Sequence, residues 1–302
     1  MLDLGIVVVS YNTRDLLRTC LQSIYASRGE FTFGVCVVDN GSSDDSAAMV
    51  SAEFPQVELI ANEENVGYPA ANNQGLKAFG FSESSEETDE SEAPRFALLL
   101  NSDTEVPPDG LALMLEFMAD HPDAGAAGPK LVRPDGSLDL ACRRSFPTPE
   151  VSFYRMTGLS RIFPGHPRFG QYNLTYLNPD QMTEVDSVVG AFMLVRGEAI
   201  QEAGLMDESF FMYGEDLDWA YRIKNAGWKI YYTPTVTVLH VKKASTRQNP
   251  RAQVEFYRAM EIFYRKHFAA QTRWWVHNLV IGAISTRLKL EQLRVAVSAA
   301  GR

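Results

Sequence analysis

Long apolar segments are missing from this sequence. No run of about 20 apolar residues occurs, so we expect no segment to span a membrane. The apolar stretch Leu4–Val9 is short and ends in Ser10-Tyr11-Asn12 instead of a cleavage site, so no signal peptide is expected. Only three of the 302 residues are cysteine, and Cys20 and Cys36 lie in apolar patterns typical of core thiols. This composition predicts a reducing, cytoplasmic location.

Basic residues are outnumbered. The chain has 28 Lys and Arg against 38 Asp and Glu, which gives a formal net charge of -10. Six of the acids lie within residues 82–94, so the remainder carries a net charge of only -4. Nucleic acid is therefore not expected as a partner, because phosphate binding requires a basic face. The acidic stretch 82–94 has almost no apolar residue and is expected to be a solvated, disordered loop.

The common phosphate-binding loops are also missing. The sequence has no GxGxxG or Walker motif, and nothing resembles an activated Ser or Cys nucleophile. A sugar nucleotidyltransferase would need a glycine-rich, basic loop after its first strand, and Ser10-Tyr11-Asn12-Thr13 is not one. The sequence therefore does not favour that class of enzyme. A protein that binds sugar nucleotides without catalysis is a second alternative to the hypothesis developed below.

Short apolar runs alternating with helical patterns fill the first third of the chain. We expect strands at Leu4–Val9, Phe33–Val38, Val57–Ala61 and Phe96–Leu100, with amphipathic helices between them. Strand–helix units in series predict an α/β fold with a doubly wound, mostly parallel sheet. Polar loops at the strand ends would then lie at one edge of this sheet.

The strand expected at Phe96–Leu100 ends in Asn101, Ser102 and Asp103. In open α/β sheets, ligands bind beyond the carboxyl ends of the strands, so Asp103 is placed where it could hold a metal and a phosphate. The alternative is that these polar residues form only a turn, in which Asn, Ser and Asp are common.

The second half of the chain has a different character. We expect strand pieces at Ala126–Val132 and Gly136–Arg144, and a longer strand at Val185–Val195 that contains Gly190. Residues 146–179 are rich in Pro, Gly, Tyr and Arg without a clear period, which predicts a long ordered loop or small subdomain over the acceptor site. A final strand is expected at Lys229–Leu239, with a break or an edge at Pro234.

The last 50 residues are helical in pattern and rich in aromatic and basic residues, among them Trp274, Trp275 and Arg287. Two interpretations remain open. The helices could pack on the domain or on a second subunit, giving a homodimer. Alternatively, they could lie in a membrane interface, with the tryptophans at the headgroup level.

Several acidic residues and one histidine follow expected strand or helix ends. Asp103 and His240 suit a divalent ion such as Mn²⁺ or Mg²⁺, although a lone histidine is more often structural. Glu215-Asp216, between a glycine and a helix, could supply a general base.

Five motifs together resemble glycosyltransferase family 2, most closely its rhamnosyltransferase-like members. They are Val7-Val8-Val9-Ser10-Tyr11-Asn12, Val37-Val38-Asp39-Asn40-Gly41-Ser42-Ser43-Asp44, Asn65-Val66-Gly67-Tyr68 with Asn72-Asn73-Gln74-Gly75, Leu100-Asn101-Ser102-Asp103-Thr104, and Tyr213-Gly214-Glu215-Asp216. The resemblance covers about residues 4–245. It implies a GT-A fold over residues 1–250, a C-terminal helical extension at 251–302, and inverting transfer from a nucleotide sugar.

The resemblance also assigns residues to roles. It implies a set that holds the nucleotide sugar: Ser10, Tyr11, Asn12, Asp39, Asn65, Gly67, Asn72, Asn101, Ser102 and Gly190. Asp103 and His240 would bind Mn²⁺ or Mg²⁺ on the diphosphate. Asp216 would take the proton from the acceptor hydroxyl, with Glu215 beside it. The family motif is commonly Asp-x-Asp, and Asn101 at its first position is a departure that leaves the metal to Asp103 and His240.

The main hypothesis is therefore a metal-dependent, inverting glycosyltransferase. Its donor would be a dTDP- or UDP-sugar, most specifically dTDP-L-rhamnose, and its acceptor a polysaccharide or lipid-linked glycan at the inner face of the cell membrane. Another hexosyl- or galactofuranosyltransferase of the same family is the nearest alternative.

Overall fold

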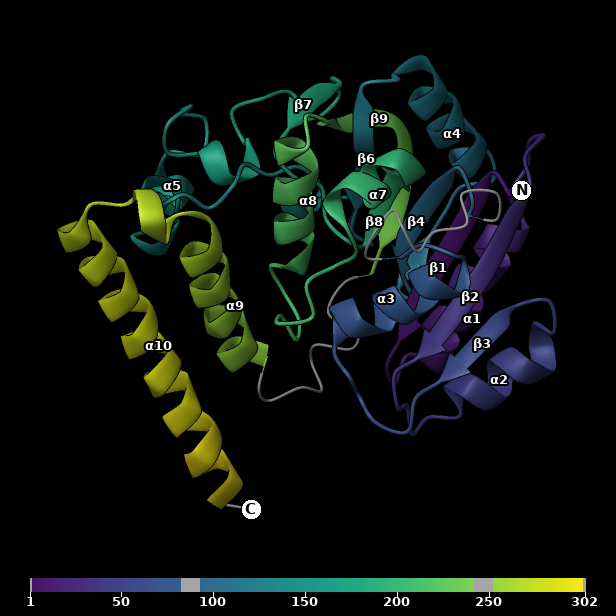
Figure 1. The fold of residues 1–302 in the computed structure, drawn as a ribbon, viewed down its shortest axis with the longest axis horizontal. Coiled ribbons are helices and arrows are strands. Elements are labelled where there is room, and N and C mark those ends of the chain that lie inside the picture. The colour runs from purple at the N-terminus through teal and green to yellow at the C-terminus, as the bar shows by residue number, and fades with distance from the viewer. Residues whose placement is uncertain (1, 83–92, 242–251, 301–302) are drawn as a thin grey trace.

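The structure, a computed structural model, describes residues 2–82, 93–241 and 252–300. Most of the acidic stretch expected to be a disordered loop, residues 83–92, lies outside these ranges. The described chain builds a mixed sheet with helices on both faces, and a pair of helices at one end (Figure 1).

Nine strands form the sheet: β1 (Leu4–Ser10), β2 (Phe33–Asp39), β3 (Glu58–Ala61), β4 (Phe96–Asn101), β5 (Thr104–Glu105), β6 (Ala124–Val132), β7 (Thr183–Val185), β8 (Phe192–Arg196) and β9 (Lys229–His240). Their order is β3-β2-β1-β4-β8-β6-β9-β5, with β7 paired to β9. Strands β1 to β4 run parallel, as expected. Strand β8 runs antiparallel to both β4 and β6, and β6 and β9 are again parallel.

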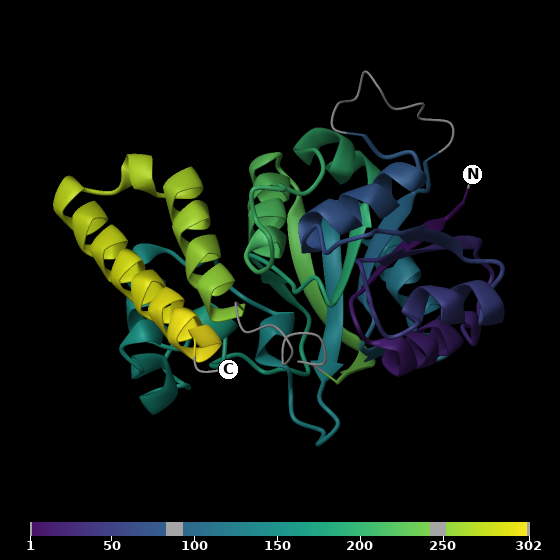
Figure 2. The ribbon, with the colours of Figure 1, turned by 90° about the horizontal axis from the view of Figure 1, so that it is seen from below.

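Ten α-helices accompany the strands in the described ranges: α1 (Arg14–Tyr25), α2 (Ser46–Glu53), α3 (Tyr68–Ala78), α4 (Gly110–Asp120), α5 (Pro149–Met156), α6 (Leu159–Ile162), α7 (Gly197–Ala203), α8 (Glu215–Asn225), α9 (Ala252–His267) and α10 (Trp274–Ala300). Helices α3 and α7 cover one face of the sheet and α1 covers the other (Figure 2). Every residue of β1 is consequently buried, which explains its unbroken apolar sequence.

Close packing fixes the contact between α3 and the sheet. A Cβ atom added at Gly75 would lie 2.5 Å from a methyl carbon of Val7, so the helix can sit this close only because residue 75 has no side chain. Cys20 and Cys36 are fully buried in the same core, as expected for structural thiols.

Three expectations for the second half need correction or refinement. Gly136–Arg144 is not a strand: Val132 and Leu138 form an isolated bridge, and Asp139 then caps a 3₁₀ turn by accepting the Ala141 N–H. Val185–Val195 is not one strand, because the chain leaves the sheet between β7 and β8. The expected break at Pro234 is present within β9, where pairing with β6 jumps from Thr233 to Thr237.

The segment 146–179, expected to be a loop or small subdomain, contains α5 and α6 and a 3₁₀ turn at Gln171–Asn173. Arg143 holds its far end, because its guanidinium donates to the carbonyl oxygens of Leu177 at 2.8 Å and Asn178 at 3.0 Å. The segment is therefore anchored to the main sheet where it returns to it.

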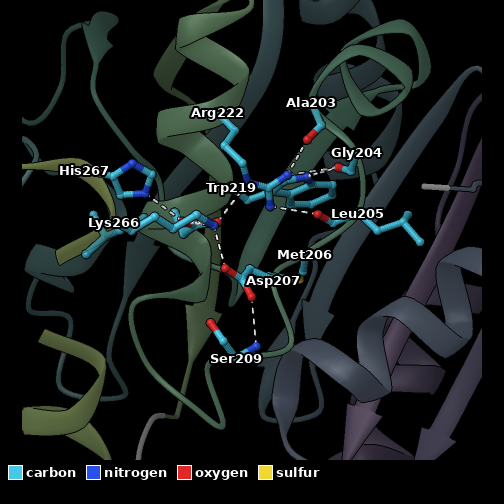
Figure 3. A network of polar contacts seen from close by, with 12 residues as sticks. Ala203, Gly204, Leu205, Met206, Asp207, Ser209, Trp219, Arg222, Lys266 and His267 are labelled. Atoms are coloured by element: carbon cyan, nitrogen blue, oxygen red, sulfur yellow. Dashed lines mark hydrogen bonds and ion pairs between the residues drawn. The ribbon is translucent and has the colours of Figure 1, made fainter. Parts of the chain in front are cut away.

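Helix α9 joins the sheet through a buried ionic network around Asp218 of α8, whose partners Arg222, Lys266 and His267 are labelled in Figure 3. The Asp218 carboxylate accepts from Arg222 at 2.9 Å and from His267 at 2.7 Å, and lies 2.8 Å from Lys266. Burial alone would raise the pKa of Asp218, but these partners outweigh it and lower the pKa to about 2. Phe263 of α9 adds an apolar contact beside the network.

Helix α10 packs antiparallel to α9 on the side away from the sheet (Figures 1 and 2). One face of α10 buries Ile284, whereas the opposite face exposes a row of apolar side chains. We call this row the α10 stripe: Trp275, Leu279, Leu290, Leu293 and Val297. In the part of the chain that the structure describes, no helix combines the length and apolar composition needed to cross a membrane.

Candidate active site

Parallel pairing brings three strand ends to one edge of the sheet. Ser10 at the end of β1 pairs with Asp39 at the end of β2, and Val9 pairs with Asn101 at the end of β4. The residues that the sequence places after these strands therefore lie side by side, as expected from the rule for open α/β sheets.

Hydroxyl groups join the loops after β1 and β4. The Thr13 hydroxyl lies 3.0 Å from that of Ser10 and 2.8 Å from that of Ser102. Tyr11 is half-buried in the same loop. Asn12 adopts a positive φ of 53° and braces the loop after β2, because its side-chain oxygen accepts the Ser43 N–H at 2.8 Å.

Asp39 has an unused binding group. One of its carboxylate oxygens accepts the Ser42 N–H at 3.0 Å, and the other is buried without a hydrogen-bond partner among the described residues. A buried, unpaired carboxylate oxygen costs about 1–3 kcal/mol or more. A ribose hydroxyl or a base N–H would remove that cost, so the residue fits the nucleoside part of a donor.

The loop before α3 is held in one conformation. The side-chain oxygen of Asn65 accepts from Asn40 and from the Gly67 N–H, each at 3.0 Å. Gly67 has a φ of +95°, and a Cβ atom there would lie 2.9 Å from the Phe211 carbonyl oxygen. The Asn72 amide donates to the Tyr68 carbonyl oxygen at 2.8 Å, so this side chain contacts its own helix.

Tyr68 connects Asn101 at the end of β4 to the loop that carries Gly190. Its buried hydroxyl lies 3.0 Å from the side-chain oxygen of Asn101 and 3.0 Å from the Gly190 carbonyl oxygen. The Gly190 N–H in turn donates to Asp216 at 3.1 Å. The backbone groups of Gly190 thus contact both Asp216 and Tyr68. The side-chain oxygen of Asn101 is likewise in contact with the Tyr68 hydroxyl.

Asp216 lies in the first turn of α8 and forms a buried ion pair. Its Oδ2 accepts from Arg144 at 2.7 Å, in addition to Gly190, and its Oδ1 accepts from the Leu217 N–H at 2.8 Å. Both side chains of the pair are less than one-tenth exposed. The positive end of the helix dipole adds to the stabilisation of this carboxylate.

Glu215 is buried beside Asp216 but has no cation of its own. One carboxyl oxygen of Glu215 has no partner among the described residues. Burial, followed by the negative charge of Asp216, raises the pKa of Glu215 to about 8, although Arg144 opposes this change. At neutral pH, Glu215 is therefore mostly a neutral acid, whereas Asp216 pairs with the single arginine. Two adjacent carboxyl groups thus have different electrostatic environments.

Asp103 and His240 meet where β5 pairs with the end of β9, with Thr104 opposite His240. The His240 Nε2 lies 3.3 Å from Asp103, and its Nδ1 lies 3.0 Å from Asp139. Burial alone would lower the pKa of His240, but these two carboxylates outweigh it and raise the pKa to about 9.

This arrangement fits a divalent metal. A ligating histidine commonly donates its second N–H to a carboxylate, and Asp139 lies where it could accept such a hydrogen bond from His240. No group of three or more Asp, Glu, His or Cys side chains suited to a metal occurs within the described ranges. Asp103 and His240 would thus supply two ligands, and phosphate oxygens and water the rest.

Three site residues were missed from the sequence: Tyr68, Arg144 and Asp139. Tyr68 belongs to the motif Asn65-Val66-Gly67-Tyr68 that carries the family resemblance, and this membership could have suggested a role. Arg144 and Asp139 lie in a stretch interpreted as a strand, and no local pattern marks them. Only the tertiary structure brings them to the site.

Comparisons with known proteins point to one family. The sequence profile described as Glycosyl transferase family 2 matches residues 5–178, and that of Glycosyl transferase family group 2 matches residues 168–300. A protein of Mycobacterium tuberculosis, N-acetylglucosaminyl-diphospho-decaprenol L-rhamnosyltransferase, is 29% identical over 273 residues, which cover 90% of this chain and 86% of that protein.

Two solved structures share the architecture. The mannosyltransferase PcManGT of Pyrobaculum calidifontis, solved with GDP-Man and Mn²⁺, has a TM-score of 0.56 at 16% identity over 100% of this chain and 76% of its own. GalNAc-T7, solved with UDP, GalNAc and Mn²⁺, has a TM-score of 0.59 at 14% identity over 100% of this chain and 58% of its own. These similarities confirm the GT-A fold.

The raised pKa of Glu215 predicts a pH-dependent effect of Glu215→Gln. The unfolded chain releases this proton near pH 4.5, whereas the folded protein holds it to about pH 8, so wild-type stability falls between these values. Glu215→Gln has no titratable group at this position, so its stability does not fall in this way. Its stability relative to wild type should rise by on the order of 1 kcal/mol per pH unit between about pH 5 and 8, measured by urea unfolding. The exposed control Glu58→Gln should show no trend, and parallel curves for Glu215→Gln would contradict the assignment.

Proposed function

This chain belongs to glycosyltransferase family 2, and from that premise we propose that it moves an L-rhamnosyl residue from a nucleotide diphosphate donor to a hydroxyl of a lipid-linked glycan, with inversion. The observation that carries the proposal is the buried Glu215–Asp216 pair at the sheet edge that also holds Asp39 and the Asp103–His240 pair. The Mycobacterium tuberculosis relative supports both the sugar and the class of acceptor. Such an enzyme would act in the synthesis of a bacterial cell-surface polysaccharide.

Donor binding is proposed to use the three strand ends. The unpartnered oxygen of Asp39 would accept a hydrogen bond from the nucleoside, and the loop of Ser10, Tyr11 and Asn12 would surround it. A dTDP- or UDP-sugar fits this set, because a pyrimidine base and its sugar offer N–H and O–H donors. The diphosphate would then point along β4 toward Asp103.

The reaction would be a single displacement. Asp216 takes the proton from the acceptor hydroxyl, the hydroxyl oxygen bonds to the anomeric carbon, and the bond from that carbon to the phosphate oxygen breaks. The nucleoside diphosphate leaves with the electron pair. Glu215, as a neutral acid, can donate a hydrogen bond to a sugar hydroxyl. Holding both reactants in line supplies much of the rate enhancement, and the segment 146–179 would hold the acceptor.

Asp103 and His240 would hold Mn²⁺ or Mg²⁺, with Asp139 fixing the imidazole ring. When bound, the ion would neutralise charge on the departing diphosphate. The two structural relatives solved with Mn²⁺ support a divalent ion in this fold.

Helix α10 is proposed to contact an anionic membrane. Lys289 and Arg294 are sequence neighbours of Leu290 and Leu293 and, at 100° per residue, lie on opposite sides of the α10 stripe. Residues 269–300 hold four basic residues and one acidic residue, whereas the whole chain carries -10. An apolar stripe flanked by cations suits lipid headgroups. In a dimer through this face, the same cations would approach one another.

We also propose that residues 1–250 form the catalytic unit and residues 251–302 the extension that places it at the inner membrane face. The buried network around Asp218 supports a firm connection between the two, because α9 supplies both Lys266 and His267. A membrane-bound acceptor would then be presented to the segment 146–179, which lies near α9 and α10 in both views (Figures 1 and 2).

Asp216→Asn should reduce transfer from dTDP-L-rhamnose to a polyprenyl-diphosphate GlcNAc acceptor by at least about 100-fold, because the variant cannot accept the proton. Donor binding, followed as a thermal shift with Mn²⁺, should persist. Asp120→Asn, at the exposed end of α4, serves as the control. Full turnover by Asp216→Asn would refute its role as the base. Transfer from UDP-galactofuranose or another donor in place of dTDP-L-rhamnose would identify a different member of the family.

Asp139→Asn should weaken Mn²⁺ binding about 10- to 100-fold by leaving the His240 ring without its carboxylate partner. Binding is measured by electron paramagnetic resonance with a nucleoside diphosphate present. Asp103→Asn and His240→Gln should abolish it, and His121→Gln, a histidine of the α4 end, should leave it unchanged. Equal affinity in Asp139→Asn and wild type would place the metal elsewhere.

Wild-type protein should float with phosphatidylglycerol vesicles and much less with neutral phosphatidylcholine vesicles. The triple change Leu279→Gln, Leu290→Gln and Leu293→Gln, or the pair Lys289→Gln and Arg294→Gln, should reduce flotation. The matched pair Arg28→Gln and Arg95→Gln, exposed on the sheet half, should not. If the wild type stays with the soluble fraction and light scattering gives a dimer that the triple change dissociates, the α10 stripe binds a second copy instead.

A further inference from the structure

Arg144 is the one described arginine in contact with the candidate base, and neither the sequence motifs nor the comparisons assign it a role. It lies just before the segment 146–179 and is 7% exposed. Its Nη2 lies 2.7 Å from Asp216, 2.6 Å from the Val188 carbonyl oxygen and 3.1 Å from the Ser187 hydroxyl. These contacts join α8, the loop that carries Gly190, and the start of the segment 146–179.

The backbone of Arg144 is fixed as well. Its N–H donates to the Ser187 carbonyl oxygen at 2.9 Å, and its own carbonyl oxygen accepts from Ser187 at 3.1 Å. Arg144 therefore has little freedom to follow Asp216 if the carboxylate moves. A fixed donor gives the carboxylate one preferred orientation, which the Gly190 N–H reinforces from a second direction.

We propose that Arg144 is a positioning residue that orients the Asp216 carboxylate and balances its negative charge, so that it can take the proton of the acceptor hydroxyl. This inference rests on the proposed function, in which Asp216 is the base. It goes beyond that function because it attributes the difference in environment between Asp216 and Glu215 to one cation.

Charge balance at the start of α8 explains why such a cation is needed. The groups that face Asp216 are Glu215 from the same helix, Tyr68 from α3, and Arg144, beside which Tyr172 of the segment 146–179 lies. Two buried carboxyl groups cannot both ionise cheaply beside one another. Of the two carboxyl groups, the guanidinium contacts only that of Asp216, and Glu215, whose pKa is raised to about 8, retains its proton at neutral pH.

The same contact affects the step after transfer. When Asp216 has accepted the acceptor proton, Arg144 lies beside a neutral acid and its own charge is no longer compensated. Loss of that proton to solvent restores the ion pair. Arg144 thus favours return of the base to its starting form, and it does so without contacting substrate atoms.

The experiment compares Arg144→Met and Arg144→Lys with Arg143→Met, in the full-length protein. Arg143 is the matched control because it is equally buried and holds carbonyl oxygens, but does not contact Asp216. Arg144→Met should lower kcat by about 100-fold or more while the KM for the donor stays within about threefold. The acidic limb of the pH profile of kcat should move to higher pH, because removing a neighbouring cation makes any carboxylate easier to protonate.

Arg144→Lys separates charge from geometry. A lysine retains the cation, so the acidic limb should stay nearer to that of the wild type, but kcat should remain reduced because one ammonium cannot reproduce the fixed contacts to Val188 and Asp216. Arg143→Met should leave the limb in place. An unmoved limb in Arg144→Met, or a loss of kcat matched by an equal loss of donor affinity, would overturn the proposal.

A double-mutant cycle of thermal stability tests the pairing of Arg144 with Asp216 even if the proposed function is wrong. If wild-type protein transfers no sugar from any nucleotide donor, the function is wrong. The pairing can still be tested by thermal unfolding: Arg144→Met should lower Tm by much less in an Asp216→Asn background than in the wild type, because the charge it balances is already gone. Equal shifts in Tm in both backgrounds would show that Arg144 does not serve Asp216.

Discussion

The parallel register of β1, β2 and β4 is the constraint on which the site depends. It places Ser10, Asp39 and Asn101 at one edge, and each loop that follows is then obliged to lie beside the others. The antiparallel strand β8 next to β4 brings the Gly190 loop to the same edge. Backbone pairing thus brings the site together. The sequence has only to place suitable polar residues at the strand ends.

Compensation of buried charge forms a second level of organisation. Asp218 has two cationic partners, Arg222 and Lys266, and a contact with His267 that helps to attach α9, whereas Asp216 has one cationic partner and Glu215 has none. The number of charged partners of each buried carboxyl group thus falls from Asp218 through Asp216 to Glu215. Uncompensated groups are costly to bury, and here they occur where a substrate would supply the missing partners.

Much of the donor half could be predicted from the sequence, because it depends on local patterns. The apolar run Phe96–Leu100 ending in Asn101 to Asp103 gives both the strand and the position of its polar end. The remainder depends on contacts between residues far apart in the chain. Arg144 meets Asp216 across 72 residues, and His240 meets Asp139 across 101. The misinterpreted stretch Gly136–Arg144 shows the same limit, because the side chain of Asp139 and the neighbouring loop override its apolar pattern.

The two arginines in succession, Arg143 and Arg144, have a consequence for how such proteins diversify. Arg143 ties down the returning end of the segment 146–179, and the backbone of Arg144 ties down its beginning. A change of sequence between these two anchors would leave the hydrogen bonds at both ends, and the strand ends of the sheet, in place. If the segment binds the acceptor, as proposed, acceptor preference could therefore change without loss of the residues proposed to bind the donor.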